Sequence, residues 1–315
     1  MLISVFYILA SLILFYFGSS WLVKGSSALA IKAGISPLVA GLTIVAFGSS
    51  APALFVSGNA AFIGHGNIAI GNIIGSNMFN ICVVLGISAI ISPLKIKLLL
   101  LKLIIPALII STIGFMILFA DRQISRLEGG ILLSGILLYS MLIIIFARRE
   151  KDNEDINELS NPVANANTKW YWSAGMIVPG IALLVVGSEL LLKGAITIAI
   201  YLGVGETITG LTVIAASTSV PILVSSLVAA KSKKYDIVLG NVIGANLFNI
   251  LGIIGISSLI SPLSAIAISN IDLYIMLGVT LFLIPFLRKS YILKRDEGIF
   301  MIILYLMYMF YLWPR

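Results

Sequence analysis

Residues 41–53 read GLTIVAFGSSAPA, and residues 210–222, 169 positions later, read GLTVIAASTSVPI. At the same offset, GNIIGSNMFNI (71–81) is matched by GNVIGANLFNI (240–250) without a gap. Chance matches between segments rich in Leu and Ile do not preserve Gly, Asn, Ser and Pro at one fixed spacing. The chain is therefore predicted to contain one unit in two copies.

Composition places this duplicated unit in a membrane. Of the 315 residues, 60% are hydrophobic and 10% are charged, and the mean hydropathy is +1.12. No soluble core could hide that much apolar surface from water. A helix that crosses a bilayer needs about 20 mostly apolar residues. Such windows recur at 2–23, 36–63, 67–91, 98–120, 127–147, 172–192, 205–230, 236–260, 270–287 and 297–313. We therefore predict an all-α integral membrane protein with ten transmembrane helices.

The basic residues between these windows indicate how the chain is oriented. Sixteen of the 20 Lys and Arg residues fall on one side of the predicted membrane, and only Arg122, Arg126, Lys193 and Arg315 fall on the other. The positive-inside rule then places both termini outside the cytoplasm and residues 148–170 inside it, as a linker. The net charge of +7 is scattered between spans, so it does not indicate nucleic-acid binding.

Ten spans in two copies give five spans per copy, and an odd number inserts the second copy upside down. We expect inverted five-helix repeats at 1–147 and 171–315, whose motifs at 41–81 and 210–250 meet near the middle of the bilayer. This architecture is typical of secondary transporters. The sequence shows no nucleophile, base or metal cluster with workable spacing, so neither an enzyme nor a cofactor is expected.

The first repeated motif sets hydroxyl groups beside a proline. Inside a helix, Pro52 and Pro221 have no N–H to donate, so we expect each helix to be broken there and to release backbone carbonyls. The hydroxyls beside these breaks belong to Ser49, Ser50, Thr218 and Ser219. Many oxygen atoms held near the middle of a membrane predict a site for a cation.

The second repeated motif adds asparagines and closely packed helices. Glycines four residues apart, such as Gly71 and Gly75, allow two helices to approach closely. The asparagines of the motif are Asn72, Asn77 and Asn80 in the first copy and Asn241, Asn246 and Asn249 in the second. A single asparagine could equally well bond two helices together, but the repeated set favours a functional site.

Three other polar residues have simpler interpretations. Glu189 lies inside an apolar span, and Lys193 follows four residues later on the same helix face, which favours an ion pair. His65 lies in a short outer turn and is expected to be solvated. Cys82, the one cysteine, lies in an apolar span and is expected to serve packing.

With these motifs the chain resembles the cation/Ca2+ exchanger superfamily, and most of all the prokaryotic sodium/calcium exchangers. The matching patterns are G-x-T-x-x-A-x-[GS]-[ST]-S-x-P in helices two and seven and G-N-x-x-G-[SA]-N-x-x-N in helices three and eight, and the resemblance covers the whole chain. It implies cation antiport by alternating access, in which the first and sixth helices slide over the rest. It also implies four clustered ion positions, lined by the carbonyls of Ala46 and Ala215 and by the side chains of Ser49, Ser50, Ser76, Asn80, Thr218, Ser219 and Asn249.

The chain departs from this family after each proline, where the resemblance implies a glutamate. Ala53 and Ile222 stand there instead, Asn249 stands where relatives often have aspartate, and Ala245 replaces the serine matched by Ser76. A bare divalent ion without a counter-charge incurs a desolvation cost on the order of tens of kcal/mol. Because solvation scales with the square of the charge, we expect Na+ or K+ to be favoured over Ca2+.

Two alternatives stay open. Half-helices starting near Pro52 and Pro221 would point positive N-termini at the midplane, which would suit a non-metal or anionic substrate on the same fold. A non-transporting or site-inactivated family member is the other alternative. The expected partners are membrane lipid and small ions.

Overall fold

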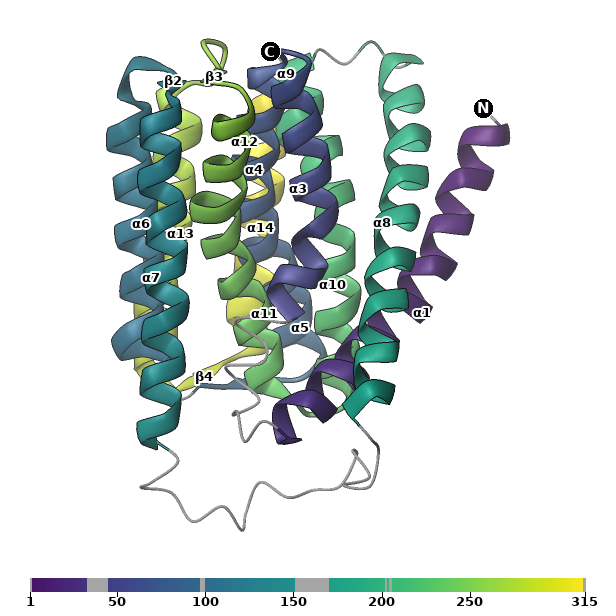
Figure 1. Ribbon diagram of the computed structural model, residues 1–315, viewed down its shortest axis with the longest axis vertical. Helices are drawn as coiled ribbons and strands as arrows, with labels where there is room; N and C mark the ends of the chain where they lie inside the picture. The colour runs from purple at the N-terminus through teal and green to yellow at the C-terminus, as the bar shows by residue number, and fades with distance from the viewer. Residues whose placement is uncertain are drawn as a thin grey trace.

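The computed structural model describes residues 2–32, 45–96, 100–150, 170–201, 203 and 206–313, and these residues are almost entirely helical (Figure 1). In the first half the elements are α1 (Leu2–Lys32), α3 (Ala46–Phe62), α4 (Gly66–Phe79), η2 (Asn80–Leu85), α5 (Gly86–Ile91), β1 (Leu94–Lys95), η3 (Leu100–Ile104), α6 (Ile105–Leu118), η4 (Phe119–Asp121), β2 (Gln123–Ile124) and α7 (Arg126–Glu150). In the second half they are α8 (Trp170–Tyr201), α9 (Glu206–Thr209), η6 (Gly210–Ile214), α10 (Ala215–Lys231), α11 (Tyr235–Leu247), η7 (Phe248–Ile253), α12 (Ile254–Ile260), β3 (Leu263–Ser264), α13 (Asn270–Ser290), β4 (Ile292–Leu293) and α14 (Arg295–Leu312).

Several of these elements follow one another without interruption and form longer helices. The longest such segments are 66–91, 206–231 and 235–260. Within the described part of the chain, seven helical segments are long and apolar enough to cross a membrane. The prediction of an all-α membrane protein is therefore confirmed. The predicted linker lies outside the described residues, apart from 148–150 at the end of α7 and Trp170 at the start of α8.

The predicted helix breaks at the two prolines are wrong. Helix α3 runs through Pro52, and α10 runs through Pro221. A proline removes a single hydrogen bond, and a helix can absorb that loss by bending. No half-helix starts at either proline, so neither supplies the positive N-terminus that would favour an anionic substrate.

Irregular helix geometry is found at other places in the motifs. Segments η2 and η7 are π-helical and contain Asn80 and Asn249, and η6 is π-helical immediately before α10. Short π-helical turns inside α-helices are frequent at functional sites. They reorient the side chains that follow, whereas the sequence had placed the irregularity at the prolines, as breaks that release backbone carbonyls.

Helices α1 and α8 pack mainly against each other, on one side of the molecule (Figure 1). The contact is close because glycines face it: a Cβ atom on Gly18 would lie 2.9 Å from the carbonyl oxygen of Gly180. Phe15, Leu22 and Leu184 fill the space between the helices. The pair therefore has an apolar contact of its own, separate from the main core.

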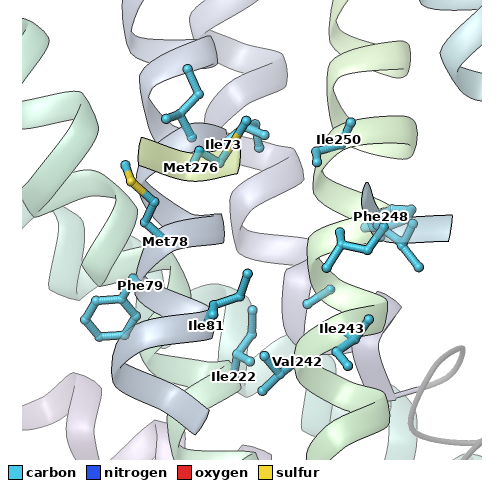
Figure 2. Packing of buried hydrophobic residues seen from close by; sticks show 14 of the residues in the cluster. Ile73, Met78, Phe79, Ile81, Ile222, Val242, Ile243, Phe248, Ile250 and Met276 are labelled. Atoms are coloured by element: carbon cyan, nitrogen blue, oxygen red, sulfur yellow. The ribbon is translucent and has the colours of Figure 1, made fainter. Parts of the chain in front are cut away.

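The main core lies between α3, α10 and the long segments 66–91 and 235–260. Buried apolar side chains from these helices fill it, with Ile222 and Val242 among them (Figure 2). A Cβ atom on Gly75 would lie 2.1 Å from the carbonyl oxygen of Leu211 in η6. The expected close approach of helices at the second motif is thus present at Gly75.

Two short strand pairs connect the halves of the chain. β1 pairs with β4, with Leu94 opposite Leu293, and β2 pairs with β3, with Gln123 opposite Ser264. β1 and β3 are separated by the repeat offset of 169, as are β2 and β4. In Figure 1, β4 lies at the bottom of the molecule, whereas β2 and β3 lie at the top. Each end of the bundle therefore has one strand pair made from both halves.

Candidate functional site

The repeated motifs come together in the centre of the bundle, where α3, α4, α10 and α11 pack against one another. Every residue that the sequence suggested for ion binding is at most 1% exposed: Ala46, Ser49, Ser50, Ser76, Asn80, Ala215, Thr218, Ser219 and Asn249. None of these polar side chains faces lipid. We call this buried polar region, formed by the nine residues and the motif asparagines around them, the central chamber.

Two equivalent hydrogen bonds join the halves of the chain at the chamber. The Ser49 hydroxyl donates to Asn241 Oδ1 at 2.8 Å, and the Thr218 hydroxyl donates to Asn72 Oδ1 at 2.8 Å. Each bond pairs a hydroxyl of one half with an asparagine of the other. A hydroxyl whose proton is committed in this way still has oxygen lone pairs available for a cation.

Serines hold these two asparagines in place. Asn72 donates its amide to Ser57 Oγ at 2.9 Å, and Asn241 donates to Ser226 Oγ at 2.9 Å. Asn241 also reaches Ser225 Oγ at 2.9 Å. Since the amide nitrogens are bonded to the serines, the amide oxygens of Asn72 and Asn241 face the hydroxyls of the first motif.

A crossed set of four asparagines also belongs to the chamber. Asn246 donates to the backbone oxygen of Asn77 at 3.2 Å, and Asn77 donates to the backbone oxygen of Asn246 at 3.5 Å. Asn80 donates to Asn246 Oδ1 and Asn249 donates to Asn77 Oδ1, both at 2.9 Å. All four side chains are at most 2% exposed. The amide nitrogens of Asn80 and Asn249 are thus occupied, and their orientation is fixed.

Four oxygen atoms of the chamber have no hydrogen-bond partner within the described residues. They are Ser50 Oγ, Ser219 Oγ, Asn80 Oδ1 and Asn249 Oδ1. Leaving a buried polar group unpartnered costs about 1–3 kcal/mol. The four atoms form two pairs at the repeat offset, and each can act as an acceptor, as a ligand of a cation must.

The two halves of the chamber differ at one position. Ser76 Oγ lies 3.2 Å from the carbonyl oxygen of Ala215 and 3.3 Å from Thr218 Oγ1. Its counterpart at the repeat offset is Ala245, whose side chain can make neither contact. The carbonyl of Ala215 therefore has a serine hydroxyl from the other half of the chain beside it, which the carbonyl of Ala46 lacks.

The positions that the resemblance assigns to glutamate carry no charge in this chain. Ala53 is 2% exposed and Ile222 is 1% exposed, so both lie inside the protein. The described parts of the chain hold no group of three or more His, Cys, Asp and Glu that could bind a metal ion. The residues that define the chamber supply hydroxyls, amides and backbone carbonyls.

The structure also places the three residues for which the sequence suggested simpler roles. Glu189 and Lys193 form an ion pair at 3.0 Å, with both side chains at least half exposed. His65 is exposed in the turn before α4, and Cys82 is buried in the apolar core. All three interpretations are confirmed.

Sequence reasoning missed the role of several neighbouring residues. Asn72, Asn77 and their counterparts had been assigned to a functional site as part of the repeated set, but not as the residues that position the proposed ligands. The supporting serines had not been noticed. Ser57 and Ser226 are separated by the repeat offset of 169, so the same comparison of the two halves could have found them.

Comparison with known proteins agrees with this geometry. The family model described as "Sodium/calcium exchanger protein" matches residues 3–146 and, separately, residues 172–313. The putative antiporter CaxA of Alkalimonas amylolytica is 34% identical over 317 residues, with 99% of both chains covered. The sodium/calcium exchanger MaX1 of Methanosarcina acetivorans is 29% identical, with 96% of both chains covered. A solved structure of the sodium-calcium exchanger NCX_Mj, soaked with Na+ and Sr2+, superposes with a TM-score of 0.80 at 33% identity and covers 97% of both chains.

Proposed function

Because this chain belongs to the sodium/calcium exchanger protein family, we propose that it is a secondary-active cation antiporter whose site prefers monovalent cations such as Na+ to Ca2+. One observation carries the proposal. Four buried oxygens without partners among the described residues, Ser50 Oγ, Ser219 Oγ, Asn80 Oδ1 and Asn249 Oδ1, belong to a chamber whose nine suggested ligands and motif asparagines include no carboxylate.

We propose that the chain crosses the membrane ten times as two inverted five-helix repeats, 1–147 and 171–315, joined by the linker 148–170. The family model supports this division because it matches each half separately. The strand pairs support the inversion, since the pairs related by the repeat offset lie at opposite ends of the bundle (Figure 1). Inverted repeats with a site between them are a common transporter architecture.

The proposed orientation in the cell membrane has both termini outside and the linker in the cytoplasm. Helix α1 begins and α14 ends at the same end of the molecule, and α7 ends at the opposite end (Figure 1). The opposite end also carries Lys95, Lys231 and Lys294, which belong to the larger group of basic residues. An excess of Lys and Arg marks the cytoplasmic side of a membrane protein.

Charge is the reason to expect a monovalent ion. Ca2+ takes 6–8 oxygen ligands, usually with carboxylates among them. A divalent ion without carboxylates must recover a desolvation cost on the order of tens of kcal/mol from neutral dipoles alone. Rings of neutral carbonyls do suffice for K+ in channels. The replacement of both glutamates by Ala53 and Ile222 therefore favours Na+ or K+.

The proposed transport motion is a slide of α1 and α8 over the other helices, which would expose the chamber to each side in turn. These two helices pack mainly against each other, and strand pairs connect the loops of the remaining helices. Such a division into a mobile pair and a fixed body is consistent with alternating access.

Flux measurements in liposomes test the proposal. The full chain is reconstituted, and uptake of 22Na+ and 45Ca2+ is measured under opposing Na+ gradients, beside a variant that combines Ala53→Glu and Ile222→Glu. We expect Na+ exchange without Na+-driven Ca2+ uptake in the unmodified chain, and a gain of Ca2+ uptake in the variant. Robust Na+-driven Ca2+ uptake by the unmodified chain would refute the monovalent preference.

A third variant and a control complete the experiment. Thr218→Val keeps the shape of the side chain but removes the hydroxyl bonded to Asn72, so Na+ exchange should fall at least about tenfold. Thr112→Val removes a buried hydroxyl on α6 that bonds only its own helix at Leu108, and should leave exchange unchanged. No flux of any ion, rescued by the two glutamates, would instead identify a site-inactivated family member.

A further inference from the structure

We propose that the central chamber holds one monovalent cation at a time, so that transport is an obligatory one-for-one exchange that moves no net charge. The inference rests on the proposed function of the same site and specifies its stoichiometry. It follows from the formal charge of the helices that form the chamber and from the number of oxygens that lack a partner.

The helices that form the chamber carry no formal charge along most of their length. Residues 46–62, 66–91, 215–230 and 237–260 contain no Asp, Glu, Lys, Arg or His. The chamber is therefore neutral before an ion enters, and it has a charge of +1 once a monovalent ion is bound.

Two sets of charged residues on neighbouring helices have partners of their own. On α8, Glu189 and Lys193 neutralise each other at 3.0 Å and are at least half exposed. Asp272, in the first turn of α13, accepts hydrogen bonds from the Ser269 backbone at 3.0 Å and from the Tyr308 hydroxyl at 3.1 Å. Its carboxylate therefore caps α13 and binds α14. Helix α13 begins directly after the loop that contains β3, so Asp272 lies at that end of the bundle.

A second monovalent ion would meet the full repulsion of the first. Two unit charges about 4 Å apart, at the effective dielectric constant of about 20 that suits protein sites, repel strongly enough to weaken binding about a thousandfold. A site with carboxylates would cancel that repulsion, because each added ion could be matched by a negative charge. Neutral oxygens cannot do so, and the chamber therefore saturates with one ion.

The unpartnered side-chain oxygens of the chamber are divided equally between the two halves of the chain. Each half of the chain supplies one hydroxyl and one amide oxygen: Ser50 and Asn80 from the first, Ser219 and Asn249 from the second. In the proposed bound state, one cation between the halves takes up all four. The same atoms make the empty chamber unfavourable, because each buried acceptor then lacks a partner. The empty form is thus disfavoured as a carrier, and a cation must return for each one released.

The test measures occupancy and current separately. In the first part, 22Na+ bound to the full chain in lipid nanodiscs is titrated to saturation. In the second part, liposomes carrying the chain are given Na+ on one side and either Na+ or choline on the other, on a solid-supported membrane that records current. We expect one Na+ per chain, tracer exchange that falls at least tenfold with choline, and no sustained current. The variant combining Ala53→Glu and Ile222→Glu should bind more than one Na+, which shows that the assay can detect it.

The possible outcomes separate this inference from the function on which it rests. Two or more Na+ per unmodified chain, or a sustained current toward choline, would overturn the one-for-one exchange and leave cation transport intact. If the unmodified chain binds no Na+ and moves no tracer, both the inference and the proposed antiport are wrong.

Discussion

Asn77 and Asn246 bond to each other's backbone across the two halves of the chain. The Asn246 amide lies 3.2 Å from the carbonyl oxygen of Asn77, and the Asn77 amide lies 3.5 Å from the carbonyl oxygen of Asn246. The side-chain oxygen of each residue also holds the amide of a proposed ion ligand: Asn249 for Asn77 and Asn80 for Asn246. A single pair of residues thus fixes both the contact between the halves and the orientation of the site.

Replacing Asn246 by Ala should both destabilise the protein and weaken ion binding. The substitution leaves the Asn80 amide buried without its acceptor, which costs about 1–3 kcal/mol of unfolding free energy. Thermal unfolding in detergent and the Na+ concentration for half-maximal tracer exchange measure the two effects. Asn59→Ala, at an exposed position of α3, is the matched control. Equal thermal stability of the two variants would contradict the structural role of Asn246.

Two glycine substitutions should have opposite effects. In Gly75→Ala the new Cβ would lie 2.1 Å from the Leu211 carbonyl oxygen and 2.6 Å from the Ala215 side chain, so α4 must move away from α10. In Gly58→Ala the nearest atom, on Ile260, is 3.7 Å away, and the smaller entropy of the unfolded chain should add about 0.4–1 kcal/mol of stability. Folded yield by size-exclusion chromatography should collapse for the first variant and hold for the second.

Labelling of single cysteines should reveal the orientation. The native Cys82 is buried, so labelling of an introduced cysteine can be measured without replacing Cys82. Gln123→Cys in β2 should react with a membrane-impermeant maleimide on intact cells, whereas Lys95→Cys in β1 should react only after the cells are permeabilised. Both positions are exposed. Labelling in the reverse order would show that the proposed topology is inverted.

Exchange of monovalent cations should be insensitive to mild acid. The helices that form the chamber contain no carboxylate or imidazole over 46–62, 66–91, 215–230 and 237–260, so no proton competes with the ion there between about pH 5.5 and pH 8. The variant combining Ala53→Glu and Ile222→Glu should lose activity toward the acid end, because a protonated carboxyl no longer balances a cation. Tracer exchange across this pH range makes the comparison. A steep acid loss in the unmodified chain would imply a titratable group in the transport path.

The sequence was sufficient to predict which residues converge, because the repeat offset selects them without knowledge of the fold. Ser49, Thr218, Asn80 and Asn249 were expected to meet inside the protein, and all four are buried and bonded to asparagines of the other half. The offset is informative because two copies of one unit must place equivalent residues in equivalent surroundings. Hydropathy similarly predicted a helical membrane protein, since a bilayer leaves few other backbone structures available.

The sequence could not predict how each helix would accommodate its irregular residues. Pro52 and Pro221 were expected to break their helices, yet both helices continue, and π-helical turns occur at η2, η6 and η7 instead. The choice between a bend, a break and a π-helical turn depends on packing between helices, which local sequence does not encode. The crossed bonds of Asn77 and Asn246 depend on that same packing, and so they also became visible only in the structure.

The exchange of asparagines between the halves also constrains how such a protein can be altered. Asn77 comes from one copy of the repeat yet orients Asn249 of the other, and Asn246 does the reverse for Asn80. Mutations that change the asparagines of one repeat alone will therefore disturb the orientation of proposed ligands in the other repeat. Changes of ion preference in this architecture should arise as matched pairs of mutations, each of which is harmful by itself.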